Sequence, residues 1–166
     1  MNTRIAIALA VALMTATASG ACSRAAGLLK GFEGFRPSIY KCEAGRDTIG
    51  YGFTEGRLLA RGRMTEGEAT AELERICGEI AGRLRKEGGI ILNPSEEAAV
   101  VSFVYNVGWG AFKSSMMFRL LKAGRRGAAI GAEFRKWVYV TKGGKKVVSK
   151  GLASRRAEEA RVFMCG

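Results

Sequence analysis

The chain has 166 residues, of which 48% are hydrophobic and 25% are charged, a composition that fits one globular domain and excludes a disordered chain. Its formal net charge of +12 favours an anionic partner, such as nucleic acid, anionic lipid or an acidic wall polymer, without choosing among them. Histidine is absent, which excludes the Ser-His-Asp and Cys-His routes of catalysis and removes the commonest metal ligand.

Residues 1–23 are predicted to be an export segment. Arg4 precedes an uncharged run over residues 5–23, whose first half is apolar and whose second half consists mainly of small residues. Such a pattern is typical of an export signal, and the run is too weakly apolar for a stable membrane span. The sequence leaves open whether this segment is cleaved, retained or released, and we expect residues 24–166 to form the functional domain.

The four cysteines, Cys22, Cys42, Cys77 and Cys165, lie far apart and include no CxxC pair, which argues against a zinc cluster. In an oxidising compartment they could form two disulfides, and three pairings are then open.

The rest of the chain predicts a helix-rich domain with one small β lobe. A short helix is expected over residues 25–34, followed by a hairpin within residues 40–53, where strand-forming residues alternate with glycines. The next helix should begin at Thr65, because Thr65-Glu-Gly-Glu68 fits a capping box, and should end at Gly88-Gly89.

Asn93 and Pro94 are expected to open a central helix, as its N-cap and first-turn residue. Residues 98–104 are apolar on nearly every face, which places this helix in the middle of the core. Three further helices and one turn complete the prediction: residues 114–121, residues 128–138, a turn at Gly143-Gly144, and residues 152–164 with Arg155, Arg156, Glu158 and Glu159 at or near the solvent side. The fold class is α+β, with a cleft between the lobes that suits a polymer.

Glu33 is the first candidate for chemistry. It stands between Phe32 and Phe35 at the end of the first expected helix. Apolar neighbours raise the pKa of a carboxylic acid by disfavouring its charged form, which is what a general acid at neutral pH requires. These residues alone leave open that Glu33 merely ends a helix.

Three ordered blocks, which together span residues 25–163, resemble the phage-type lysozymes (glycoside hydrolase family 24). The first block combines Glu33, Cys42 and Thr48 with the Ile-Gly-Tyr-Gly that follows. The second block covers residues 102–115, and the third runs from Trp137 to Glu158. The resemblance implies a lysozyme-like fold and an endolysin that hydrolyses the β-1,4 bond between N-acetylmuramic acid and N-acetylglucosamine in peptidoglycan.

The resemblance also assigns roles to single residues. Glu33 would protonate the glycosidic oxygen, Cys42 would occupy the place of the second catalytic residue, and Thr48 would position the attacking water or the sugar. The substrate contacts matched in this way are Thr54, Tyr105 and Ser115, with a core position equally open for Tyr105. Trp109 and Trp137 are expected to be packing residues.

Two residues depart from the family pattern. Cys42 replaces a carboxylate, and an ordinary thiol is mostly uncharged at neutral pH unless cations such as Lys41 and Arg46 lower its pKa. Whether Cys42 acts as a base, a nucleophile or a water-positioning group therefore stays open, with Asp47 and Glu43 as alternative second carboxylates. Phe53 stands where the family often has histidine.

The resembling group includes signal-arrest-release endolysins, which are held inactive on the membrane by a weakly apolar N-terminal anchor. Some of them use thiol exchange, which suggests that Cys22 and Cys42 pair or exchange. Cys77 and Cys165 would then staple the last helix to the body, unless Cys77 is simply a small buried residue.

The expected partners are the glycan strands of peptidoglycan and, before release, the inner membrane through residues 5–21. The resemblance implies a monomer that needs no metal or other cofactor, binds no nucleic acid, and acts at the periplasmic face of the host inner membrane and then in the periplasm.

Two other functions fit the sequence. One is a non-catalytic cationic wall- or membrane-binding protein on a lysozyme fold, in which Lys145-Lys146 and Arg155-Arg156 act on anionic envelopes. The other is a transglycosylase, which cleaves the same bond without water.

Overall fold

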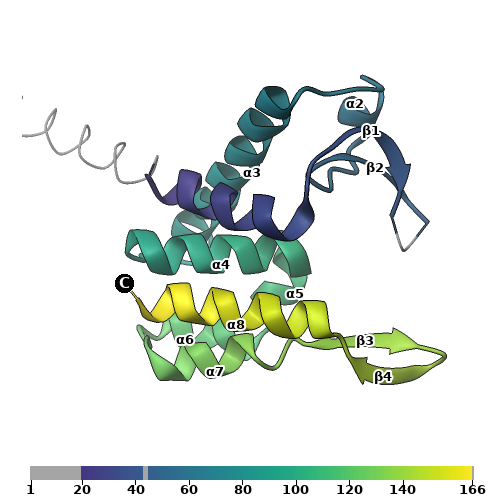
Figure 1. Cartoon of the computed structure of the whole chain (residues 1–166). Coiled ribbons are helices and arrows are strands. Elements are labelled where there is room, and N and C mark those ends of the chain that lie inside the picture. Colours follow the sequence, from purple (N-terminus) through teal and green to yellow (C-terminus); the bar gives the residue numbers. More distant parts are fainter. Residues whose placement is uncertain (1–19, 43–44, 166) are drawn as a thin grey trace, which may run out of the picture.

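A computed structural model describes residues 20–42 and 45–165 of the chain (Figure 1). The predicted export segment lies almost wholly outside the described residues. Within them, no helix combines the length and apolar character needed to cross a membrane. The N-terminal helix covers residues 20–33, so it begins before the expected residue 25 and includes the buried Ala21. A boundary between residues 23 and 24 therefore falls inside a helix that packs on the body.

Four long helices form the body. The N-terminal helix and α3 (Glu66–Lys86) lie on one side of α4 (Pro94–Val107), and α8 (Lys150–Met164) lies along the other side (Figure 1). Three short helices, α5 (Trp109–Lys113), α6 (Met116–Lys122) and α7 (Ala128–Phe134), complete the part of the body next to α8.

The central position of α4 is confirmed. Every residue from Glu97 to Val104 is buried, and the Phe103 ring makes edge-to-face contacts with Phe112, Phe134 and Trp137. Because this helix is covered on all sides, it fixes the positions of the elements that surround it.

The predicted capping box at Thr65 is present, and the predicted N-cap Asn93 also forms a capping box. The side chain of Thr65 accepts from the Glu68 backbone N–H, and Asn93 accepts from the N–H groups of Ser95 and Glu96. In each box the glutamate returns a contact to the backbone N–H of the capping residue. The start of α3 and the start of α4 thus follow directly from local sequence.

The β lobe is the antiparallel hairpin of β1 (Arg36–Lys41) and β2 (Asp47–Gly50), followed by the short helix α2 (Gly56–Leu59). The register pairs Tyr40 with Thr48 and Arg36 with Gly50, with an irregularity between these pairs. The predicted hairpin is confirmed, although its first strand begins at Arg36 and not at residue 40.

A second hairpin was not expected. β3 (Tyr139–Lys142) pairs with β4 (Lys145–Val148) in the segment that was predicted as the end of a helix and a turn. Helix α7 ends at Phe134, whereas residues 128–138 were predicted to be helical. The turn itself is confirmed, because Gly143 and Gly144 both have positive φ angles, as a two-residue hairpin loop requires. In Figure 1 both hairpins project from the same side of the molecule, away from the C-terminus.

Candidate active site

Glu33 lies where the N-terminal helix ends. Gly34 follows it with a φ of 66°, and the Gly34 N–H donates to the Lys30 carbonyl at 3.2 Å, which closes the helix. The Glu33 side chain is 23% exposed, so it is mostly covered and still reachable from solvent. The helix end therefore presents one carboxylate at the junction of the body and the β lobe.

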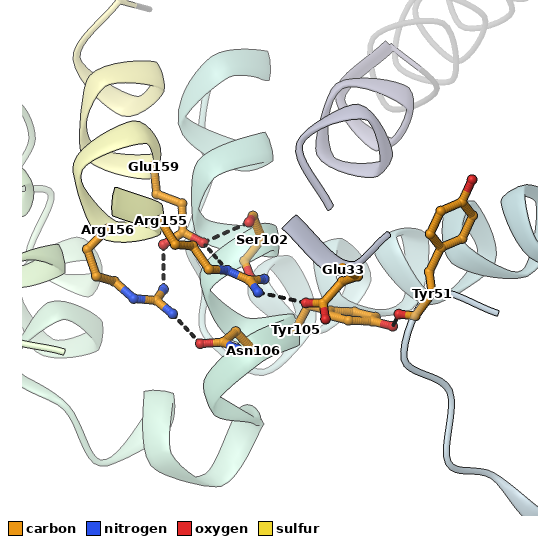
Figure 2. A network of polar contacts seen from close by, with 8 residues as sticks. All are labelled: Glu33, Tyr51, Ser102, Tyr105, Asn106, Arg155, Arg156 and Glu159. Atoms are coloured by element: carbon orange, nitrogen blue, oxygen red, sulfur yellow. Dashed lines mark hydrogen bonds and ion pairs between the residues drawn. The ribbon is translucent and has the colours of Figure 1, made fainter. Parts of the chain in front are cut away.

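Arg155 of α8 holds one oxygen of this carboxylate. Its Nη1 lies 2.6 Å from Glu33 Oε1, its Nε donates to Glu159 Oε1 at 3.1 Å, and its Nη2 donates to the Ser102 carbonyl at 3.2 Å. Figure 2 shows the guanidinium between the two carboxylates. Because every nitrogen has an acceptor, the guanidinium has one orientation, and it fixes Glu33 in turn.

The network continues into the core behind Arg155. Glu159 accepts from the Ser102 hydroxyl at 2.7 Å and pairs with Arg156, which also contacts the Asn106 side chain. Burial raises the pKa of the Glu159 carboxyl and lowers the pKa of the Arg156 guanidinium, while their mutual attraction opposes both shifts. The buried charges compensate one another. The network that holds the Glu33 carboxylate in place therefore includes residues of both α4 and α8.

This network corrects the prediction for α8. Arg155, Arg156 and Glu159 are buried and do not face solvent. Only Glu158 fits the expectation, because it pairs with Arg161 near the surface. Buried charges are tolerated here since each one has an oppositely charged partner and further hydrogen bonds.

The other side of Glu33 faces Gly52 and Tyr105. The Tyr105 hydroxyl donates to the Tyr51 carbonyl at 2.8 Å, which holds the ring beside Glu33 (Figure 2). Gly52 has a φ of 93°, and a Cβ there would lie 3.4 Å from Glu33 Oε2. The oxygen that Arg155 does not engage is therefore the one next to the backbone of the β lobe.

The expected apolar surroundings of Glu33 are corrected. The Phe32 ring lies 4.8 Å under the guanidinium of Arg155, and the Phe35 ring packs on Tyr51. Both aromatic rings therefore contact the neighbours of Glu33, and the direct partner of the carboxylate is a cation.

The β1–β2 hairpin positions Cys42 and Thr48. The Cys42 N–H donates to the Arg46 carbonyl at 3.0 Å, and the Thr48 hydroxyl donates to the same carbonyl at 3.1 Å. Thr48 is buried and Cys42 is half-buried. Because the Thr48 proton is used within the hairpin, its oxygen is left to act as an acceptor.

Tyr40, which the sequence did not single out, lies near two of the predicted catalytic residues, Glu33 and Cys42. The pKa of its phenol is raised first by burial and then by the charge of Glu33, with a smaller contribution from Cys42. The guanidinium of Arg36, 5.5 Å from the ring centroid, opposes these effects. Glu33, Tyr40 and Cys42 are thus electrostatic neighbours at one end of the site.

A cleft of about 450 Å³ lies between the β lobe and the helical body. It contains three of the predicted site residues, Glu33, Thr54 and Tyr105, whereas Cys42 and Thr48 are not among its lining residues. The residues that complete the lining are Arg46, Gly52, Phe53, Glu55, Ile76, Ile80, Arg83, Val104, Asn106 and Trp109. The cleft predicted between the lobes is therefore present, and Glu33 is on its wall.

Ser115 lies elsewhere, as the N-cap of α6. Its hydroxyl donates to the Phe112 carbonyl at 2.6 Å and accepts from the Phe118 N–H at 3.1 Å. These two bonds use the hydroxyl proton and one of its two acceptor positions. The structure therefore gives Ser115 a capping role outside the cleft lining, and its predicted sugar contact stays a prediction.

The two tryptophans pack against the core, as expected. Trp137 meets the Phe103 ring edge-on, at a centroid distance of 5.3 Å. Trp109 packs on Phe112 and also lines the cleft, where the guanidinium of Arg83 lies 4.4 Å from its ring. Trp109 is thus both a packing residue and part of the cleft wall.

Cys22 lies against α3 and not near Cys42. Its Sγ would be 3.9 Å from a Cβ placed on Gly78, and Glu33 follows eleven residues later, about 16 Å further along the same helix. Because Cys42 neighbours the Glu33 end, pairing it with Cys22 requires this helix to rearrange. Exchange between the two thiols stays a prediction.

The predicted staple between Cys77 and Cys165 is not formed in this structure, where both are free thiols. Cys165 is exposed at the end of α8, and Cys77 is buried within α3. Burial raises the pKa of Cys77 to about 12. Cys77 therefore matches the alternative interpretation, a small buried residue.

In the described part of the chain, no three His, Cys, Asp or Glu side chains gather in a way that could hold a metal ion. The cleft wall carries carboxylate, hydroxyl and guanidinium groups, which suits proton transfer to and from a bound polymer, and the Cys42 thiol lies on the β1–β2 hairpin outside the cleft lining.

A glycosidase of the lysozyme class fits this fold and this site. The phage lysozyme family matches residues 30–159, and the chain belongs to that family. The endolysin of Acyrthosiphon pisum secondary endosymbiont phage 1 is 34% identical over 82% of this chain and 92% of its own length. The SAR-endolysin of Bacteriophage PS119 is 32% identical over 96% of both chains.

A solved structure supports the same conclusion. The muramidase domain of SpmX from Asticaccaulis excentricus is 30% identical and superposes with a TM-score of 0.73 over 84% of this chain and 94% of that domain. The predictions of a lysozyme-like α+β fold and of a peptidoglycan-lytic glycoside hydrolase of the endolysin type are confirmed. Peptidoglycan is accordingly the substrate.

Proposed function

We propose that the protein hydrolyses the β-1,4 bond between N-acetylmuramic acid and N-acetylglucosamine, with Glu33 as the general acid. The observation that carries this proposal is the Glu33 carboxylate on the cleft wall, whose Oε1 is held by buried Arg155 at 2.6 Å. The other oxygen remains to present a proton to the glycosidic oxygen as the bond to the sugar breaks.

The β1–β2 hairpin supplies the second half of the reaction. Water that adds to the sugar must lose a proton, and Cys42 is the second catalytic residue that we assign to this side. Thr48 has an oxygen free to accept a hydrogen bond from that water, because its own proton is donated to the Arg46 carbonyl. Thr54 and Tyr105, both on the cleft wall, are the proposed sugar contacts.

The N-terminal segment is proposed to act as an export signal and a releasable membrane anchor. The match to the SAR-endolysin of phage PS119 leaves only 4% of this chain outside, so it includes part of residues 1–23. The enzyme would then be held at the periplasmic face of the host inner membrane before it acts, as a monomer, in the periplasm. Residues 24–166 would carry the catalytic site.

The test is the release of reducing ends from purified peptidoglycan by the full chain and by its Glu33→Gln variant at equal concentration. Glutamine keeps the size of the side chain and cannot donate a carboxyl proton, so we expect turnover to fall by at least about 10²-fold. Equal melting temperatures of the two proteins serve as the control for folding.

Other outcomes separate the competing functions. Equal lysis by parent and variant would identify a cationic binder that disrupts envelopes without Glu33. Anhydro-muramic ends in place of reducing ends would identify a transglycosylase.

A further inference from the structure

The β3–β4 hairpin carries a concentration of positive charge that the catalytic site does not use. No aspartate or glutamate occurs between residues 135 and 157. Lys142, Lys145 and Lys146 are all exposed, and none of them forms an ion pair with another of the residues that the structure describes. The hairpin is therefore an unneutralised cationic arm.

The register places two of these lysines side by side. Lys142 and Lys145 are cross-strand partners, so their side chains leave the same face of the hairpin. Like charges at directly opposed positions destabilise a two-stranded sheet. This pair of lysines lowers the stability of the free protein. Such a pair is expected at a site where an anion binds between the two side chains.

The root of the hairpin is attached firmly to the helical body. The Ser149 N–H donates to the Val138 carbonyl at 2.8 Å and closes the root of the hairpin, while Trp137 packs on Phe103 of α4. Arg155 follows Ser149 by six residues, about 9 Å along α8, and holds Glu33. The hairpin and the β lobe project from the same side of the molecule (Figure 1).

We propose that the β3–β4 hairpin is a second substrate-binding element, which binds carboxylates of the peptide stems of peptidoglycan through Lys142, Lys145 and Lys146. This inference rests on the proposed function. Where peptide stems are joined to the lactyl groups through amide bonds, the glycan backbone is neutral and the stems carry the negative charge. Binding the stems at the hairpin would help to hold the glycan strand in the cleft.

The order of residues in the hairpin favours this partner over an anionic lipid surface. Its tip is Lys142-Gly143-Gly144-Lys145, which has no apolar side chain, whereas the exposed apolar side chains, Tyr139, Val147 and Val148, belong to the two strand pairs farthest from the tip. A hairpin that enters a bilayer needs its apolar residues at the tip. Charges at the tip suit carboxylates on a polymer in water.

The test measures co-sedimentation with intact peptidoglycan sacculi in a cleavage-deficient Glu33→Gln background. The hairpin variant adds Lys142→Gln, Lys145→Gln and Lys146→Gln. The matched control adds Lys86→Gln, Lys122→Gln and Arg125→Gln, three exposed cations that also lack an ion pair within the described residues. Both variants lose three positive charges, and the melting temperature of each is checked against the parent.

We expect the hairpin variant to bind sacculi about ten-fold more weakly than the parent, as three screened ion pairs would give. The difference should vanish on sacculi whose carboxylates have been amidated, and the control variant should bind as the parent does. Equal loss in the control would overturn the proposal in favour of net charge alone, and unchanged binding of the hairpin variant would overturn it outright.

Two further arms separate the remaining possibilities. Vesicles containing phosphatidylglycerol should bind the parent and the hairpin variant equally, and a loss confined to vesicles would replace the stems with a lipid surface. Release of reducing ends by the chain with intact Glu33 is measured in parallel. If that activity is absent while stem-dependent binding persists, the proposed function fails and the binding site remains.

Discussion

Arg155 is the residue on which the orientation of Glu33 depends. Its guanidinium joins a carboxylate at the cleft to a carboxylate and a carbonyl in the core. A lysine has one nitrogen and could serve only part of this set. The sequence predicted Glu33, but no local pattern could reveal a partner 122 residues away, and the charges of α8 were therefore assigned to solvent.

We expect Arg155→Met to destabilise the protein and to lower its activity. The change leaves Glu159 buried beside one cation instead of two, and loss of one partner from a buried ion network costs about 3–5 kcal/mol. Chemical denaturation measures the stability, and reducing-end release measures the activity. Arg161→Gln, at an exposed position of the same helix, is the control and should leave both values near those of the parent. Unchanged activity in Arg155→Met would contradict the role given to this residue.

The second catalytic position makes a separate prediction. We expect Cys42→Ala to lower reducing-end release by about 10²-fold, because the methyl group can neither accept a proton nor attack the sugar. Cys42→Asp should retain much more activity than Cys42→Ala, since a carboxylate can take either role. Equal rates for the parent and Cys42→Ala would assign the second role to another group, such as the alternative carboxylate Asp47.

At the scale of elements, the helices that begin with a cap were predictable and the second hairpin was not. Capping boxes at Thr65 and Asn93 act within four residues of sequence, so the sequence alone places the starts of α3 and α4. Both strands of the β3–β4 hairpin are largely exposed, so they lack the alternation of apolar and polar residues that identifies a half-buried strand. Its glycine turn was the only local signal.

The cap of the central helix gives a prediction at this scale. Asn93→Ala removes the acceptor for two backbone N–H groups, those of Ser95 and Glu96, at 3.0 and 2.9 Å. We expect a loss of about 1 kcal/mol in the free energy of unfolding, with lytic activity at permissive temperature unchanged. Asn93→Asp, which keeps an acceptor at the same place, should restore most of the loss. A loss of the same size in both variants would mean that the loss does not come from the missing acceptor.

For the whole molecule, the sequence predicted the fold class and the two-lobed plan, because helix periodicity and the family blocks span nearly the full domain. It could not place the cysteines, since Cys22 and Cys77 are brought near each other by packing of two helices and not by spacing. It also could not separate the positive charges that support Glu33 from those on the β3–β4 hairpin, although both contribute to the net charge of +12.

Surface carboxylates give the last prediction, a loss of stability in acid. Hydrogen bonds from Thr65 lower the pKa of Glu68, and contacts with Arg75, Arg83 and Arg161 lower those of Glu72, Glu87 and Glu158, respectively. A carboxyl whose pKa is lower in the folded state than in the unfolded state stabilises the fold above the unfolded value, about 4.3, and this contribution is lost as the pH falls through the folded value. Protonation also increases a net charge that is already positive, which adds repulsion in the same direction.

We therefore expect the melting temperature to be level between pH 7 and pH 5 and to fall steadily from pH 4.5 to pH 2. Thermal unfolding followed by circular dichroism measures this profile. Repeating it in 0.5 M salt separates the two causes, because salt screens the long-range repulsion and leaves the close hydrogen-bonded contacts less affected. Full recovery of the melting temperature in salt at pH 3 would assign the loss to repulsion alone. Glu159 acts in the opposite sense, because burial raises its pKa and its protonation therefore costs the fold little. A melting temperature that rises below pH 4.5 would mean that the buried network, and not the surface carboxylates, governs the response to acid.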